Sequence, residues 1–307
     1  MVFVRKTKDY YVLTHSIRKN NKITQKTKYL GKELPPKSRI EQLKKEFLKE
    51  IQGEKFKYLN KEDLEMVEKK KEEYNKEIKK LSKLEKKKHF EDFMIRYTYD
   101  SSKLSGVDVT LRQTSLILKD GIIPKNFKSI KTVKEIENHE KGVVAITKYN
   151  GVLNLNFIKK LHTILFSGVD DEVAGKLRSE LKRNVKITGT VYVPPKWNDI
   201  DKEIDLFFNW YHSENRKFHP IELAALVHLK MISLQPFVDG NSRLSRLLMN
   251  WVLWKKKYPL IDIKIEDLEN YYDALDEYQI EHKERPFVNY IKEKFLEIWF
   301  VVYNLIC

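Results

Sequence analysis

Two nearly continuous apolar stretches, residues 221–234 and 247–253, constrain the fold of this chain more than any other feature. A helix that is apolar on every side has to lie inside a protein, because it offers no polar face to water. Pro220 fits the first position of the first helix, where its missing N–H group costs nothing. The polar segment between the stretches is short, so the sequence predicts two core helices joined by a tight loop.

The rest of the chain carries helical periodicity in shorter pieces. Residues 38–99 are dominated by Lys, Glu and Leu with few helix breakers, which predicts two long amphipathic helices. Four further segments place apolar residues three and four positions apart: 111–120, 132–148, 156–166 and 200–215. Together these patterns predict a mainly α protein built as a helical bundle.

Two segments depart from the helical pattern. Residues 2–31 form three runs rich in β-branched and aromatic residues, with Asn20 and Asn21 suited to a hairpin turn. Residues 185–195 alternate apolar and polar side chains about Thr188–Gly189, which predicts an exposed two-stranded hairpin. The chain is therefore expected to have three parts: a small basic β unit at 1–36, a Lys/Glu-rich helical arm at 37–89 and a main domain at 90–307.

The net charge of +15 is concentrated in the N-terminal third of the chain. Residues 1–90 hold 27 Lys and Arg against 14 Asp and Glu. A basic appendage of this kind can dock nucleic acid or an acidic partner, whereas the alternative is a solvated Lys/Glu-rich surface. The sequence leaves both interpretations open.

Nothing in the sequence predicts a membrane protein. No stretch reaches the roughly 18 to 20 apolar residues that a membrane span needs. The N-terminal residues lack the apolar region of a signal peptide, and the only cysteine is Cys307. We therefore expect a cytoplasmic, disulfide-free protein without membrane contact, and we leave open whether it forms a homodimer.

The polar loop between the two apolar stretches carries the residues best suited to chemistry. Its turn, Asp239–Gly240–Asn241, would expose free N–H groups at the start of the second helix, and such groups favour an anion. Arg243 and Arg246 lie within one turn of each other and can both reach phosphate oxygens, while the Asp239 carboxylate suits Mg²⁺. The pattern predicts a cradle for a Mg²⁺-bound nucleotide; a capped turn with two surface arginines is the alternative.

The same loop resembles the motif of the Fic family, His-Pro-Phe-x-Asp/Glu-Gly-Asn-Gly-Arg-x-x-Arg. The chain matches this motif at seven positions: Pro236, Phe237, Asp239, Gly240, Asn241, Arg243 and Arg246. Residues 174–178, 185–195 and 271–275 also resemble family segments, so the likeness covers roughly residues 90–300. The resemblance implies a Fic domain at 90–307, a helical bundle with a small β-hairpin flap, preceded by the β unit and the helical arm.

The usual reaction of this family transfers AMP from ATP to a protein hydroxyl, with the motif histidine as the base. The resemblance implies that Asp239 holds Mg²⁺, that Arg243 pairs with the leaving phosphates and that Arg246 contacts the terminal phosphate. It implies an anion hole formed by Gly240, Asn241 and Ser242. It also implies that a protein target binds as an added strand along the flap at Val185, Ile187, Val191 and Val193.

Three residues depart from the family pattern. Gln235 stands at the position of the catalytic histidine, and an amide cannot accept the proton, a role worth about 10² to 10⁴ in rate. Ser242 replaces the second glycine, and we expect its Cβ to crowd the phosphate and to disfavour a positive φ. Ser101 to Gly106 resembles the family's inhibitory helix, with Ser105 at the glutamate position, so we expect no inhibition and a free Arg246.

The sequence leaves two classes of function open. The first is a Fic-like protein adenylyltransferase that uses ATP and Mg²⁺ and is impaired by the loss of the histidine. The second is an inactive nucleotide-binding or docking protein, with a nucleic-acid adaptor acting through the basic N-terminal region as one form of it. His162 and His228 are interpreted as packing residues of the helical core and not as replacement bases.

Overall fold

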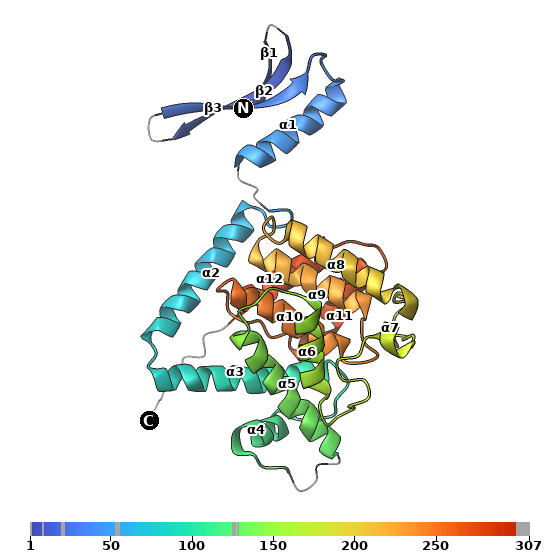
Figure 1. The fold of residues 1–307 in the computed structure, drawn as a ribbon. Helices are drawn as coiled ribbons and strands as arrows, with labels where there is room; N and C mark the ends of the chain where they lie inside the picture. Colours follow the sequence, from blue (N-terminus) through green and yellow to red (C-terminus); the bar gives the residue numbers. More distant parts are fainter. Residues whose placement is uncertain are drawn as a thin grey trace. The chain divides into compact units, whose positions relative to one another are not determined.

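The computed structural model describes residues 2–7, 9–19, 22–52, 56–124, 127 and 129–298. The chain divides into two compact units, residues 1–62 and 63–307. The boundary therefore falls inside the segment that was predicted as one helical arm, so that the first helix belongs to one unit and the next two to the other (Figure 1). The turn predicted at Asn20 and Asn21 lies outside the described residues.

The N-terminal unit is a three-stranded antiparallel sheet with one helix. Strands β1 (Val2–Lys6), β2 (Tyr11–Lys19) and β3 (Lys22–Gly31) pair in the order β1-β2-β3, and helix α1 (Lys37–Gln52) follows. The pairing of Val4 with Leu13 places both side chains on one face, since side chains alternate along a strand. This face packs against Phe47 of α1 and forms the small core of the unit.

The second unit is almost wholly helical. Its helices are α2 (Lys61–Lys80), α3 (Lys83–Lys103), α4 (Leu111–Asp120), α5 (Ile130–Lys148), α6 (Leu155–Phe166), α7 (Arg178–Leu181), α8 (Ile200–Glu214), α9 (Pro220–Leu234), α10 (Asn241–Lys255), α11 (Leu268–Gln279) and α12 (Arg285–Leu296). Two 3₁₀ turns, Trp197–Asp199 and Ile265–Asp267, precede α8 and α11. The predicted mainly α architecture with a small sheet is confirmed.

Helices α9 and α10 form the centre of this bundle (Figure 1). They pack against each other, α9 also packs against α12, and α10 also packs against α5. Both helices are buried along almost their whole length, as their apolar sequences predict. The loop between them is consequently anchored at both ends in the buried core.

The segment predicted as a β-hairpin flap turns at Thr188–Gly189, but none of residues 183–196 forms a strand. Val191 and Val193 are 78% and 80% exposed. The Tyr192 hydroxyl donates to the Ser233 carbonyl at 3.0 Å. Side-chain ties to the helices thus replace a strand ladder, which is marginal in an isolated two-stranded hairpin. The prediction of a paired hairpin is wrong, and we keep the name flap for residues 185–195.

Among the described residues, no helix has both the length and the apolar character needed to cross a membrane.

The packing of Phe47 yields a test of the two-unit division. Phe47→Ala should lower the stability of residues 1–62 by about 3 kcal/mol, because it opens a cavity in a small core. Thermal unfolding followed by calorimetry should show an earlier transition for the N-terminal unit and an unchanged transition for residues 63–307. Leu84→Ala, at a residue that is 62% exposed, is the control. A single transition that shifts as a whole would contradict independent unfolding.

Candidate functional site

A cavity of about 720 Å³ lies where three segments meet: the end of α3, the flap and the α9–α10 loop. Helix α11 closes it with Tyr272, Leu275, Asp276 and Gln279. The cavity brings together nine residues that the sequence had singled out: Ser105, Gly106, Val185, Ile187, Gln235, Asp239, Gly240, Asn241 and Ser242. Five others do not line it: Ser101, Val191, Val193, Arg243 and Arg246.

The side chain of Asn241 closes the α9–α10 loop by bonding to the loop backbone. Its Oδ1 accepts from the Phe237 N–H at 3.0 Å, and its Nδ2 donates to the Phe237 carbonyl at 2.8 Å. Gly240 adopts a left-handed conformation with φ of 75°, and a Cβ there would meet the Phe166 ring at 2.3 Å. A side chain at residue 240 would therefore be both strained and obstructed.

Gln235 ends α9 in a left-handed conformation, with φ of 49° and ψ of 58°. Both ends of its side-chain amide are engaged: Nε2 donates to the Ile232 carbonyl at 2.7 Å, and Oε1 accepts from Asn241 Nδ2 at 2.7 Å. The amide consequently forms part of the loop structure at the cavity wall.

Arg178 holds this end of α9 from the other side. Its Nε donates to the Gln235 carbonyl at 2.6 Å, and its guanidinium also donates to the Pro195 carbonyl at 2.8 Å. The side chain is fully buried, and burial lowers its pKa. This residue joins the base of the flap to the loop, a role that the sequence analysis missed because an arginine alone does not reveal its partners.

His162 of α6 supports the loop at Asp239. Its Nδ1 accepts from the Gly175 N–H at 2.9 Å, so the ring proton lies on Nε2, which donates to the Asp239 carbonyl at 3.0 Å. The ring is stacked 3.7 Å from that of Phe237. Burial lowers the pKa of His162 to about 4, so the ring is neutral at pH 7.

Asp239 is the acidic residue of the loop that is open to solvent. Its Oδ1 accepts from the Gly240 N–H at 2.6 Å, which fixes the side chain against its own turn. No three His, Cys, Asp or Glu side chains in the described part of the chain are placed to hold a metal together. A single carboxylate fits Mg²⁺, because this ion commonly takes one or two carboxylates and completes its shell with phosphate and water.

The two motif arginines are buried under the loop. Arg243 Nη1 lies 3.2 Å from Glu135 Oε1 of α5, and the two side chains are 4% and 13% exposed. Arg246 donates to the Ser101 hydroxyl and carbonyl at 3.0 and 2.7 Å and to the Ser105 hydroxyl at 2.7 Å. The expectation of a free Arg246 is therefore wrong, because serines bind it where a glutamate was missing.

Ser105 and Ser242 contact each other across the cavity floor. The Ser105 hydroxyl donates to the Ser101 carbonyl at 2.9 Å and lies 3.1 Å from the Ser242 hydroxyl. Since the single Ser105 proton is used, Ser242 has to be the donor in the second bond. Ser242 lies within the helical first turn of α10 and not at a positive φ, so the expected backbone strain is absent.

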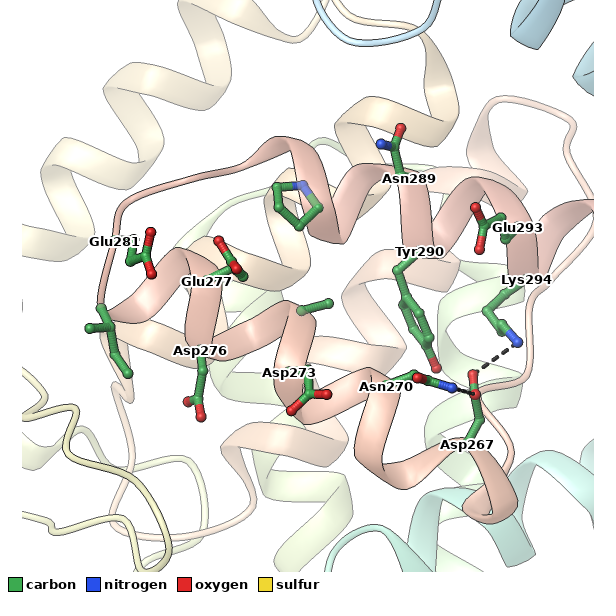
Figure 2. Close-up of a pocket in the computed structure, with 13 residues that line it drawn as sticks. Asp267, Asn270, Asp273, Asp276, Glu277, Glu281, Asn289, Tyr290, Glu293 and Lys294 are labelled. Atoms are coloured by element: carbon green, nitrogen blue, oxygen red, sulfur yellow. Dashed lines mark hydrogen bonds and ion pairs between the residues drawn. The ribbon is translucent and has the colours of Figure 1, made fainter.

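A second cavity, of about 690 Å³, lies between α11 and α12 (Figure 2). Six carboxylates line it: Asp267, Asp273, Asp276, Glu277, Glu281 and Glu293. Its one basic residue, Lys294, lies 2.9 Å from Asp267. Asp276 lines both cavities, and its Oδ1 accepts from the flap residue Thr190 at 3.2 Å. Carboxylates repel phosphate, so an anion site belongs to the first cavity.

Comparison with known proteins agrees with the resemblance seen in the sequence. Residues 152–253 match the model of the Fic/DOC family. The chain is similar to the protein adenylyltransferase Fic of Nematostella vectensis, with 29% identity over 67% of this chain and 48% of that protein. The corresponding Aedes aegypti protein is 31% identical over 65% of this chain and 40% of its own length. The chain thus spans less than half of these curated relatives.

Solved structures give the same result. A Fic domain containing signaling protein from Bacteroides thetaiotaomicron aligns with a TM-score of 0.67 and 28% identity, over 76% of this chain and 92% of that chain. Fic-1 from C. elegans aligns with a TM-score of 0.65 over 85% of this chain and 75% of that chain. At 22% identity the second likeness shows the fold alone.

The buried His162 predicts a dependence of stability on pH. Its folded pKa of about 4 lies below the ordinary 6.5, so the unfolded chain binds a proton first as the pH falls. The stability that depends on the neutral His162 ring is fully present above pH 6.5 and is lost toward pH 4. Between these values the free energy of unfolding falls by about 1.4 kcal/mol for each pH unit. His162→Asn should reduce the slope of unfolding free energy against pH by that amount in urea titrations between these values.

Leu161→Ala on the same helix is the matched control, because it removes a buried side chain without changing any titrating group. This variant should lower stability equally at each pH. An unchanged slope in His162→Asn would contradict the assignment of a buried neutral ring.

Proposed function

Since the chain belongs to the Fic/DOC family, we propose that its 720 Å³ cavity binds ATP with Mg²⁺ and that its transfer of AMP to protein hydroxyls is impaired. One observation carries this proposal: Asp239 and the first turn of α10 line the cavity, while Gln235, at the position of the base, is an amide whose two ends are hydrogen-bonded. The similar proteins from Nematostella vectensis and Aedes aegypti are protein adenylyltransferases, which supports the reaction class.

The first turn of α10 supplies the phosphate contacts in this proposal. The first N–H groups of a helix have no partner within it, and the helix dipole is positive there. Asn241 and Ser242 stand at this end and line the cavity, with Gly240 before them. Arg243 lies in the same turn, and Arg246 lies at the next, so both add positive charge beneath the anion.

Asp239 would hold Mg²⁺ against the phosphates. The ion would neutralise charge on the phosphate chain when it is bound. In the transfer, the oxygen of a target hydroxyl forms a bond to the α-phosphorus, the bond to the β-phosphate oxygen breaks, and pyrophosphate leaves. The hydroxyl proton has to go to a base. Gln235 cannot take it, which accounts for the expected impairment by about 10² to 10⁴.

The flap is the proposed place for the protein target. Val185 and Ile187 line the cavity, and Val191 and Val193 are exposed beyond it. The flap does not pair with itself, so its backbone is available to an extended target segment, which would bind by strand addition. Arg178 and Tyr192 fix the flap to α9 and would keep that segment near residue 235.

An inactive nucleotide-binding protein is the second candidate function. The observation that favours it is that both motif arginines and the residue at the position of the base are bound to other side chains. Arg243 is paired with Glu135, Arg246 with two serines, and Gln235 with Asn241. The two candidates differ in whether bound ATP is consumed.

Transfer of label from α-labelled ATP onto the protein and onto a host lysate distinguishes them. With Mg²⁺, Gln235→His should label at least about 100-fold faster than the natural chain, because it restores the proton acceptor. Gln279→His places a histidine elsewhere in the same cavity and should give no increase. Equal labelling by the natural chain and by Gln235→His would show that the activity is not impaired. Absence of label from both would speak against a transferase.

Binding of Mg²⁺-ATP is tested by calorimetry with two variants of one ion pair. Arg243→Ala should weaken binding by at least about 10-fold, since it removes positive charge beneath the phosphates. Glu135→Gln keeps an acceptor for Arg243 but removes the competing carboxylate, so it should strengthen binding several-fold. Unchanged affinity in Arg243→Ala would show that the charge of this residue does not help to bind phosphate. Weaker binding in Glu135→Gln would show that Glu135 does not compete with phosphate for Arg243.

A further inference from the structure

The N-terminal sheet has one face that the α9–α10 site does not use. Strand pairing places Phe3 opposite Thr14 and Thr27, and it places Val12 opposite Arg5 and Tyr29. These residues alternate with Val4 and Leu13, which face α1, so they lie on the other side of the sheet. Figure 1 shows α1 beside the sheet within this unit. We call the side with Phe3 and Tyr29 the open face.

Aromatic rings stand exposed on this face. Phe3 on β1 is 45% exposed and Tyr29 on β3 is 61% exposed. Tyr10, which precedes β2, is 40% exposed and lies 5.3 Å from the Tyr29 ring. The Phe3 and Tyr29 side chains lie on the two outer strands, one on each side of the central strand β2. Exposed aromatic rings gathered on one face of a sheet are typical of an interaction surface.

Smaller side chains form the floor between these rings. Val12 and Thr14 of the central strand are 8% and 0% exposed. The hydroxyl of Thr14 is buried and has no hydrogen-bond partner in the described part of the chain. The open face thus carries exposed rings on its two outer strands and closely packed side chains on its central strand.

The charge of the sheet favours an anionic ligand. Residues 2–31 carry eight Lys and Arg against one acidic residue, Asp9. Arg5 is exposed on the open face. Lys6 and Lys26 are exposed on the same two outer strands, where alternation places them on the side that faces α1, so they add to the charge of the sheet and not to the open face itself. Basic side chains contact phosphates, and exposed aromatic rings stack on bases. The bases of a duplex are already stacked on one another, so rings on a flat surface can reach only unpaired bases.

We propose that the open face binds single-stranded nucleic acid, with Phe3 and Tyr29 stacking on bases and Arg5 contacting the backbone. The proposal does not rest on the function of the α9–α10 cavity, because it concerns the other compact unit. An acidic protein would also meet the positive charge, but it offers no array of flat rings for Phe3 and Tyr29 to stack on.

Fluorescence anisotropy with the whole chain tests this proposal. The probes are a labelled 20-nucleotide single strand of mixed sequence, as DNA and as RNA, and the duplex of the same DNA. The single strands should bind more tightly than the duplex, and their affinity should fall steeply with salt. Arg5→Ala should reduce the slope of log K against log salt by about 0.7.

Two substitutions at Tyr29 distinguish ring stacking from non-specific apolar binding. Tyr29→Leu keeps an apolar side chain but removes the ring, so single-strand affinity should fall by about 5- to 150-fold. Tyr29→Phe keeps the ring and should bind as the natural chain does. Leu84→Ala, at an exposed apolar residue of the second unit, is the control and should also leave binding unchanged.

Several results would overturn the proposal. These are equal or tighter binding of the duplex, equal binding by Tyr29→Leu and Tyr29→Phe, and binding of phosphatidylserine vesicles without binding of either single strand. The thermal transition of the N-terminal unit, measured for each variant, shows whether the sheet is folded. A variant whose sheet is unfolded is replaced by Phe3→Leu, for which the same loss is expected.

Discussion

The short connection between α9 and α10 depends on the side chain of Asn241. This amide bonds both backbone groups of Phe237 and the side chain of Gln235, so it closes the loop and sets the end of α9 at once. Neighbouring helices supply the remaining support, with Arg178 at Gln235 and His162 at Asp239. Because the loop is buried among such contacts, the cavity above it has one well-defined wall.

The three departures from the Fic motif act on one connected network. Ser242 bonds Ser105, and Ser105 bonds Arg246, so two of the substituted positions meet around a buried arginine. The third, Gln235, is joined to the same loop through Asn241. Neutral groups stand at the places of a base and an acid. In this structure the three residues are joined to the site by hydrogen bonds.

Charge is distributed unevenly over the molecule. The N-terminal sheet is basic, whereas the groove between α11 and α12 is lined by carboxylates and adjoins the cavity at Asp276. In the site itself, Arg243 and Arg246 are buried beneath the loop and are compensated by Glu135 and by serine dipoles. The basic sheet, the acidic groove and the two buried arginines thus belong to separate parts of the chain.

The sequence by itself determined the mainly α fold, the core pair α9 and α10, the strands of the N-terminal sheet and the position of the loop motif, because periodicity and motif spacing are local properties. It predicted two helices over residues 38–99, where the structure has α1, α2 and α3, and it gave no expectation for α12. It also placed an amide, Gln235, at the position where the motif of the family has a histidine, since that depends on the residue at one position. Only the tertiary structure decided what the motif residues contact. Glu135 lies over a hundred positions before Arg243, and Ser101 lies still further from Arg246, so no local pattern could reveal these pairs. The flap was mispredicted for the same reason: its alternating sequence suits a hairpin, but ties from Tyr192 to Ser233 and from Thr190 to Asp276 hold it against helices distant in sequence.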